Sequence, residues 1–414
     1  MPEISIHTLG GLGDGISQLD GKPVFVEKAA AGDVLRVRLI QKTKEFSRGE
    51  IETIIKPGAD RIQPPCPHYE ACGGCSLQHL SESAYRQHKH KVMADALAHA
   101  GFAGKPFTAH FLPASSRRRV ELKWDGNRFA YYASRSRSLV PIDGCLILEP
   151  ALKALLAPLA SGLTSWRDHS AIKTVQLTAA DSGVDMAIET NRPIAADAEF
   201  FSNLAITVGL ARITLDGQLI IETKPITMQL GSHAIALPAG AFLQASKEGQ
   251  RLLTEAVLAA CKGEASVADL FCGIGTYSVP LSEKARVHSV ELGAAMIAGL
   301  RSEAKKYGLN LSAEQRDLFT APLKKEELER FSAVVINPPR PGAKAQCEAL
   351  AGSNVKKIVM VSCSPASFAR DANILRRGGY SLSQALMIDQ FVYSPHLEIV
   401  SLFSRESGNP DLTY

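Results

Sequence analysis

The chain of 414 residues lacks long apolar runs, and none approaches the roughly 20 uncharged residues that cross a bilayer. Its first residues, MPEISIHTLG, lack the basic-then-apolar pattern of a secretory signal. No residue type is in excess, with 45% hydrophobic and 21% charged residues, which excludes disordered and fibrous classes. We therefore expect a cytoplasmic protein, and the length favours about two or three domains.

A strong charge of one sign is also lacking, since the formal net charge is only +4. Basic residues nevertheless cluster in Lys22–Arg48, in Arg86–Lys91 and around Arg117, Arg118 and Arg119. Such clusters can neutralise RNA phosphates or can be ordinary solvated faces, and charge alone leaves both interpretations open.

Eight cysteines in a cytoplasmic chain do not predict disulfides. Cys66, Cys72 and Cys75 follow a C-x₅-C-x₂-C spacing, and Cys145 lies downstream. Four thiolates suit zinc or an iron–sulfur cluster. A second C-x₂-C pair, typical of zinc, is missing, which favours a 4Fe–4S cluster. The C-x₃-C-x₂-C triplet of radical enzymes is missing too, so we expect the cluster to be structural, with redox sensing as a secondary possibility.

The pattern of strands and helices predicts three domains. Residues 1–57 contain short β-rich runs separated by glycine turns, which predicts a small OB-like barrel. Residues 58–232 predict a β-rich domain with antiparallel strands from about 107 to 230, helices near 81–100 and 151–163, and the cysteine segment. Residues 233–414 alternate apolar strands with helices, which predicts a doubly wound α/β sheet and a polar tail after Arg405.

Within the α/β region, ADLFCGIG (268–275) reads as a strand entering a glycine turn before a helix, a unit that presents backbone N–H groups to a nucleotide-like ligand. The third glycine of a dinucleotide fingerprint is absent, which argues against NAD. Acidic residues follow the next two strands: Glu291 suits two ribose hydroxyls and Asp317 suits an adenine amino group. With the NPP motif that begins at Asn337, this pattern favours an S-adenosylmethionine methyltransferase.

The strand KIVMVSC delivers Cys363 at its carboxyl end, before a predicted helix whose N-terminus favours a thiolate. A thiolate that adds to uracil C6 makes C5 nucleophilic toward a methyl sulfonium. A base must then remove the C5 proton, and Glu398 in SPHLEIVSLF is our candidate. Earlier in the chain, Gln244 could bind the cofactor or the uracil edge and Phe242 could wall the pocket, although spacing alone equally fits a capped helix start.

These motifs together resemble the RNA (uracil-5-)-methyltransferase family over nearly the whole chain. The resemblance implies an N-terminal RNA-binding barrel like that of many RNA-modifying enzymes, and a 4Fe–4S site at the four cysteines. It implies cofactor contacts at Gln244, Phe271, Gly273, Gly275, Thr276, Glu291, Asp317 and Asn337. It implies Cys363 as nucleophile and Glu398 as base, and we add Phe242, Arg118 and Arg119 as candidate RNA contacts.

Three departures stand out: Ser246 replaces the usual asparagine after the phenylalanine-x-glutamine stretch, Asn337 replaces an aspartate, and SCSP replaces SCNP. None removes the nucleophile or the base, so we expect an active monomeric enzyme. The barrel and the cluster resemble enzymes of 23S ribosomal RNA, since tRNA-specific members lack both. A tRNA uridine enzyme, a purine amino-methyltransferase, a non-catalytic RNA-binding assembly factor and an iron–sulfur redox protein remain alternatives.

Overall fold

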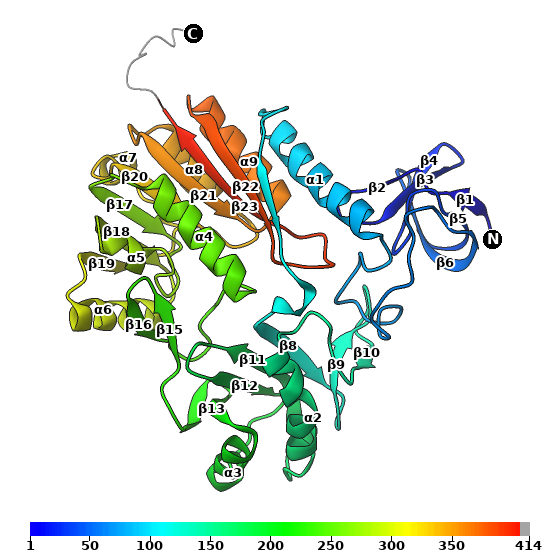
Figure 1. The fold of residues 1–414 in the computed structure, drawn as a ribbon, viewed down its shortest axis with the longest axis horizontal. Coiled ribbons are helices and arrows are strands. Elements are labelled where there is room, and N and C mark those ends of the chain that lie inside the picture. Colours follow the sequence, from blue (N-terminus) through cyan, green and yellow to red (C-terminus); the bar gives the residue numbers. More distant parts are fainter. Residues whose placement is uncertain (406–414) are drawn as a thin grey trace.

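The computed structural model describes residues 1–405, so the polar tail expected after Arg405 lies outside the described residues. Figure 1 shows three groups of elements: N-terminal strands in blue, a central sheet in teal and green, and a C-terminal α/β group in yellow to red. In this described part, no helix is both long and apolar enough to cross a membrane.

The N-terminal sheet has the order β1-β5-β6-β4-β3-β2. Its strands are β1 (Glu3–Ser5), β2 (Thr8–Leu9), β3 (Gly15–Leu19), β4 (Lys22–Val26), β5 (Val34–Lys42) and β6 (Ser47–Lys56). Between β1 and β2, the N–H of Ile6 donates to Asp33 O and that of His7 donates to Ile16 O. The segment from β1 to β2 therefore supplies both edge strands of the sheet, β1 beside β5 and β2 beside β3, around a small apolar core.

The central sheet has the order β10-β9-β8-β11-β12-β13-β14 and one parallel pair, β12–β13, connected through α3. Its elements are β8 (Arg119–Trp124), β9 (Phe129–Tyr132), β10 (Leu139–Pro141), α2 (Pro150–Thr164), β11 (Ile172–Ala179), β12 (Val184–Thr190), α3 (Ala198–Val208), β13 (Leu210–Leu215) and β14 (Gln218–Glu222), with 3₁₀ turns at Ala114–Ser116 and His169–Ala171. Apolar residues of α2 and α3, such as Leu152, Leu159 and Phe201, pack on the sheet in one core.

The C-terminal sheet has the order β19-β18-β17-β20-β21-β23-β22-β7. Its elements are α4 (Lys247–Ala260), β17 (Ser266–Leu270), α5 (Ser278–Ser282), β18 (Arg286–Glu291), α6 (Ala294–Tyr307), β19 (Leu311–Gln315), α7 (Lys325–Leu328), β20 (Ala333–Ile336), α8 (Lys344–Ala351), β21 (Lys357–Ser362), α9 (Pro365–Arg377), β22 (Ser381–Asp389) and β23 (Glu398–Ser404). Strands β17 to β21 are parallel, whereas β23 is antiparallel to β21 and β22. The chain leaves β17 toward β19 and returns to β20, so strand order reverses between β17 and β20, and open α/β sheets bind their ligands in a crevice at the carboxyl ends of such strands.

Two segments expected in the central domain belong to the C-terminal one. Helix α1 (Glu82–His99) packs its apolar residues, including Met93 and Leu97, into the core that also holds Phe368 of α9. Strand β7 (Thr108–Phe111) pairs in parallel with β22 and so becomes the edge of the C-terminal sheet. The apolar face of α1 is buried in the C-terminal core, and this burial assigns α1 to the C-terminal domain. The sequence pattern of strands and helices does not show which core a helix packs against.

The expected boundary at 232/233 is also corrected. It falls inside a two-stranded hairpin of β15 (Thr227–Leu230) and β16 (His233–Ala236). Met228, Leu230 and Ile235 of this hairpin share a core with Ile297 and Leu300 of α6. The hairpin thus covers the C-terminal sheet rather than extending the central one.

Candidate active site

The glycine loop after β17 takes backbone conformations that few residues allow. Phe271, Gly273 and Gly275 all have positive φ, of 60°, 55° and 87°. A Cβ on Gly275 would lie 2.7 Å from Leu300 Cδ1, so only glycine fits there. A non-glycine residue such as Phe271 costs energy in this conformation, which is typical of a functional loop. Thr276 completes the turn, so the four expected cofactor positions of this loop lie at the carboxyl end of β17.

Glu291 closes β18 and braces the same loop. Its Oε2 accepts from the N–H of Gly273 at 3.2 Å, and its Oε1 accepts from the N–H of Gly293 at 2.9 Å. These two bonds fix the carboxylate beside the glycine loop. A carboxylate has about four lone-pair sites, so Glu291 can still accept from two hydroxyl groups.

Asp317 follows β19, and its Oδ1 accepts from the N–H of Phe319 at 2.9 Å. That bond lowers the pKa of Asp317, so the side chain stays ionised at neutral pH. The Phe319 ring lies 5.5 Å from that of Phe271, and Phe319 and Leu292 remain 47% and 56% exposed. Exposed apolar side chains beside two carboxylates suit a ligand that is both aromatic and hydroxylated.

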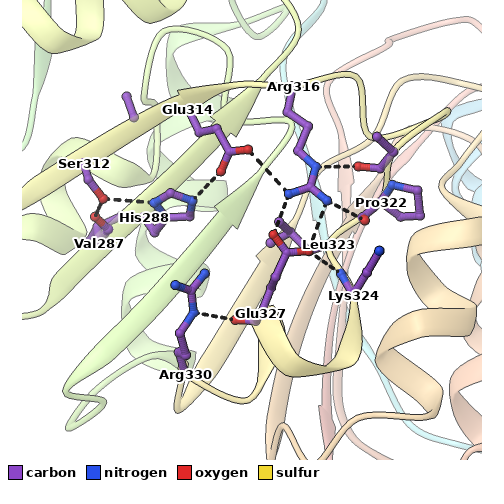
Figure 2. A network of polar contacts seen from close by, with 12 residues as sticks. Val287, His288, Ser312, Glu314, Arg316, Pro322, Leu323, Lys324, Glu327 and Arg330 are labelled. Carbon is purple, nitrogen blue, oxygen red and sulfur yellow. Dashed lines mark hydrogen bonds and ion pairs between the residues drawn. The ribbon is translucent and has the colours of Figure 1, made fainter.

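Arg316 holds the segment that carries Asp317 and Phe319 (Figure 2). Its guanidinium donates to Ala321 O at 2.6 Å and Pro322 O at 2.9 Å, and it pairs with Glu327 at 2.7 Å. A longer contact of 3.4 Å to Glu314 joins the cluster to His288 on β18. These bonds tie the turn after β19 to both α7 and the sheet, so Asp317 starts from a braced position.

Asn337 follows β20, where its backbone N–H donates to Leu270 O at 3.1 Å. The candidates Glu291, Asp317 and Asn337 and the glycine loop therefore lie on the carboxyl ends of the adjacent strands β19, β18, β17 and β20. The structure brings the expected cofactor residues of these four strands to one edge of the sheet.

Cys363 and Glu398 lie at the adjoining ends of two antiparallel strands. Ser362, the last residue of β21, pairs with Ile399 of β23, so Cys363 directly follows and Glu398 directly precedes this pair. Burial, and then the Glu398 carboxylate, raise the pKa of Cys363 to about 11, while the charge of Arg340 acts in the opposite direction. Burial therefore opposes the thiolate form that the start of α9 was expected to favour.

Glu398 is 2% exposed, and burial raises its pKa to about 7. Its Oε2 accepts from Gln390 Nε2 at 2.9 Å, a bond that acts to lower the pKa. The same Gln390 nitrogen donates to Gln244 Oε1 at 2.8 Å, so one amide connects the candidate base to a candidate cofactor residue. We call Cys363, Glu398, Gln390 and Gln244 the catalytic pocket. Gln390 belongs to no sequence motif and was not predicted as a site residue, because only the folded chain brings its side chain to Glu398.

The loop between β22 and β23, residues 390–397, is held from two sides. On α1, the buried Lys89 Nζ donates to Asp389 Oδ1 at 2.7 Å, and Tyr85 also donates to Asp389. From the cysteine segment, the N–H groups of Ser76 and Leu77 donate to Tyr393 O at 2.8 and 3.1 Å. The loop that precedes Glu398 therefore contacts residues immediately after Cys75.

Of the three expected RNA contacts, Arg119 and Phe242 are at least partly exposed, whereas Arg118 is buried. Arg118 is only 2% exposed and donates to Gln244 O at 3.1 Å and to Gln250, so it supports the backbone of the catalytic pocket and cannot reach RNA. Arg119 instead lies 5.3 Å from the ring of Phe242, which is 61% exposed. Phe242 therefore faces outward rather than lining the buried pocket around Glu398.

All four expected ligand cysteines line one cavity of about 200 Å³. Cys72 pairs with Ala133 beside β9, and Gly74 N–H donates to Cys72 Sγ at 3.3 Å. Within residues 1–405, however, no group of three or more His, Cys, Asp or Glu side chains is arranged to hold a metal ion. The structure thus gathers the four cysteines around one cavity.

A crevice between β17 and β20, a glycine loop and strand-end carboxylates define a class of α/β methyltransferase. Comparison with a solved structure supports the fold: the tRNA (uracil-54, C5)-methyltransferase of Pyrococcus abyssi, in complex with S-adenosyl-L-homocysteine, superposes with a TM-score of 0.75 at 19% identity over 97% of this chain and 100% of its own.

Sequence comparisons are more specific. The family model described as tRNA (uracil-5-)-methyltransferase matches residues 208–406. An uncharacterised RNA methyltransferase of Caulobacter vibrioides is 36% identical over 98% of this chain and all of its own length. The 23S rRNA (uracil(1939)-C(5))-methyltransferase of Aeromonas hydrophila is 31% identical over 98% and 96%. The chain therefore belongs to the RNA (uracil-5-)-methyltransferase family, and it is an enzyme that acts on RNA.

Proposed function

We propose that this enzyme transfers the methyl group of S-adenosylmethionine to C5 of a uridine in 23S ribosomal RNA, through a covalent bond between Cys363 and uracil C6. The observation that carries the mechanism is the placement of Cys363 and Glu398 at the adjoining ends of β21 and β23, one strand away from the crevice between β17 and β20.

S-adenosylmethionine supplies an electrophilic methyl sulfonium. The residues present fit it: Glu291 is fixed to accept from ribose hydroxyls, Asp317 is ionised, and the exposed Leu292 and Phe319 offer apolar surface to adenine. Asn337 and Gln244 would present amides on the side of the crevice nearer the catalytic pocket. Asn337 has no charge to contribute, but an amide still donates and accepts hydrogen bonds.

Cys363 acts first. Its thiol gives its proton to solvent water, the thiolate adds to C6 of uracil, and the electron pair of the C5–C6 double bond moves onto the ring as an enolate. With S-adenosylmethionine bound, C5 would attack its methyl carbon and S-adenosylhomocysteine would be the leaving group. Since burial keeps the resting thiol neutral, the charge of Arg340 is one contribution of the chain that favours the thiolate.

Glu398 acts second. As a carboxylate it removes the proton from C5, the C5–C6 double bond re-forms, and the bond from C6 to Cys363 Sγ breaks. A pKa near 7 suits a base that works at neutral pH, because the carboxylate is well populated yet still basic. Gln390 orients this carboxylate through Nε2 and joins its position to that of Gln244.

The choice of 23S rRNA rests on the relative from Aeromonas hydrophila, which matches over nearly both whole chains. Architecture alone does not support that choice. The enzyme from Pyrococcus abyssi acts on tRNA and its fold matches 97% of this chain, so the overall architecture does not separate the two substrate classes. A tRNA uridine is therefore the second candidate substrate.

We also propose that Cys66, Cys72, Cys75 and Cys145 hold a 4Fe–4S cluster. The four cysteines line one cavity of about 200 Å³, and four thiolates suit either zinc or an iron–sulfur cluster. The spacing, with a single C-x₂-C pair, favours the cluster. The cluster would tie the cysteine segment to the central sheet, and the N-terminal sheet, attached by Lys28 to Tyr69 O at 2.6 Å, would bind RNA.

The test is mass spectrometry of nucleosides after incubation of separate rRNA and tRNA fractions with labelled S-adenosylmethionine. We expect label in 5-methyluridine of 23S rRNA. Label in 5-methyluridine of tRNA would make tRNA the substrate and leave the proposed mechanism in place. Label in a methylated purine would contradict both the proposed substrate and the proposed mechanism. Cys363→Ala should abolish methylation and leave RNA affinity within about twofold, because the thiol contributes a reaction step and little binding. Residual 5-methyluridine from that variant would exclude the covalent mechanism.

A further inference from the structure

A second cavity, of about 210 Å³, lies next to the catalytic pocket and takes no part in the chemistry above. It is lined by Arg117, Arg119, Glu121, Gln176, Phe242, Leu243, Ala245 and Phe391. Ala245 and Phe391 line this cavity, and each directly follows a residue of the catalytic pocket, Gln244 and Gln390. These two segments therefore separate the two sites. Its volume is several times the roughly 30 Å³ of one water molecule, so it is more than a packing gap.

Phe242 gives this cavity the character of a stacking platform. A phenylalanine that is 61% exposed is costly unless something covers it, and the guanidinium of Arg119 covers only part of it, at 5.3 Å from the ring centroid. Aromatic rings and arginine planes exposed side by side are the surfaces on which unpaired RNA bases stack.

The polar groups of the cavity suit a nucleotide. Arg119 Nη2 donates to Gln176 Oε1 at 2.9 Å, which leaves the Gln176 amide nitrogen free to donate to a base edge. Arg119 Nε is buried and has no partner among the described residues. Arg117 uses its Nε on Arg119 O at 2.9 Å, so its terminal nitrogens can contact a phosphate. Glu121 supplies an acceptor for a base amino group, paired at present with Lys123 at 2.6 Å.

We propose that this cavity holds the base of an unpaired nucleotide adjacent to the target uridine, stacked on Phe242 and bounded by Phe391. The proposal rests on the proposed function in one respect, that the target uridine enters the catalytic pocket. Since the two sites share a wall, the bases of neighbouring nucleotides could occupy both at once, and a second anchored base would hold the target nucleotide out of its stack.

The experiment is a mutant cycle between protein and RNA. The probe is a hairpin cut around the uridine that the wild-type enzyme methylates, in whichever RNA that is, with an abasic ribose placed at each flanking position in turn. Binding is measured without S-adenosylmethionine for wild type, Phe242→Ala and Phe242→Tyr. At one flanking position, base removal should weaken binding of wild type about tenfold, as expected for one stacked base.

Phe242→Ala should lose about the same factor on intact RNA and nothing further on that abasic RNA, while Phe242→Tyr should bind like wild type. The matched control is Ile206→Ala, which removes another exposed apolar side chain, 73% exposed on α3, and should change no affinity. If the losses from Phe242→Ala and base removal multiply at every position, or if neither has any effect, the proposal is overturned. The formation of 5-methyluridine by wild type on the intact hairpin is measured separately, so a failed subsite cannot be mistaken for a failed reaction.

Discussion

The four-cysteine site and the catalytic pocket both contain half-buried thiols, but their surroundings differ. Cys363 directly follows β21, a strand inside an eight-stranded sheet, and begins the turn into α9. Cys66, Cys72 and Cys75 lie in a segment without regular strands or helices, which is fixed by turns and by contacts to the central sheet. Burial nevertheless raises the pKa of Cys75 to about 12 and that of Cys363 to about 11.

Similar pKa values therefore belong to two different kinds of site. Both thiols are neutral in the free protein, and each site has one nearby cation that favours the thiolate, Lys28 beside Cys72 and Arg340 beside Cys363. In the four-cysteine site, iron would replace the protons permanently. In the catalytic pocket, the negative charge leaves the sulfur when the bond to C6 forms. A high thiol pKa thus does not by itself distinguish a ligand from a nucleophile, whereas the neighbouring base Glu398 does.

The largest expected effect comes from removing that base. Glu398→Gln should lower turnover by about 10²–10⁴-fold, because a positioned base contributes that much to proton transfer. Addition of Cys363 and methyl transfer should still occur, so the enzyme should accumulate a covalent complex with methylated RNA. The measurement is a denaturing gel with labelled RNA, supported by mass spectrometry of the Cys363 peptide. Normal turnover of Glu398→Gln would mean that another residue is the base. Glu398 would then no longer distinguish the catalytic pocket from the four-cysteine site.

Stability provides the control for this variant. The pKa of Glu398, about 7 in the fold, lies above its ordinary value of 4.5. The stability gained from holding the protonated form is complete below pH 4.5 and is lost as the pH rises through 7. Glutamine stays neutral, so at pH 8 the variant should unfold at the same temperature as wild type or higher. A lower unfolding temperature would indicate that lost activity reflects misfolding.

A substitution in the four-cysteine site should instead affect stability more than turnover. Cys145→Ser should lower iron content and unfolding temperature strongly and kcat only moderately, by about tenfold or less, since its role is structural. The visible absorption of the purified protein and its iron content measure the cluster directly. Cys261→Ala is the matched control, because Cys261 is a buried core cysteine that does not line the four-cysteine cavity, so the variant should retain iron.

Full activity of a stable, iron-free Cys145→Ser enzyme would leave the cluster without a role. A complete loss of turnover with normal stability would instead mean that the two sites are coupled. Ser76, Leu77 and Tyr393 provide a route for such coupling, since the cysteine segment hydrogen-bonds the loop that leads to Glu398.

Much of the fold could be predicted from local pattern. Apolar strands that alternate with helices predicted the C-terminal sheet, and the strand at Glu398 begins where it was expected. Glu291, Asp317 and Asn337 could be found because strand ends in parallel sheets converge on one edge, so sequence order becomes spatial order. The positions of α1 and β7 could not, because their partners α9 and β22 lie almost 300 residues further along the chain.

The site itself was predictable only where residues follow strands. Arg118 looked like an RNA contact because it stands in a basic cluster, yet burial against Gln244 and Gln250 gives it a supporting role. Gln390 has no motif, and its importance comes from two acceptors that are 8 and 146 residues away in sequence. Contacts of this kind depend on tertiary packing, which a single sequence does not display.

The smallest expected effect tests whether Gln390 tunes the base. Its hydrogen bond favours ionised Glu398, so Gln390→Leu should raise the pKa of Glu398 further and move the rise of kcat to higher pH. We expect kcat to fall about tenfold at pH 7, in line with a lost bond to a charged group, and to recover at pH 9. Gln384→Leu changes an exposed glutamine on β22, the strand that leads to Gln390, and should leave the profile unchanged. Because a structural role would lower kcat equally at every pH, a uniform loss would mean that Gln390 only supports the loop, and that burial alone tunes the pKa of Glu398.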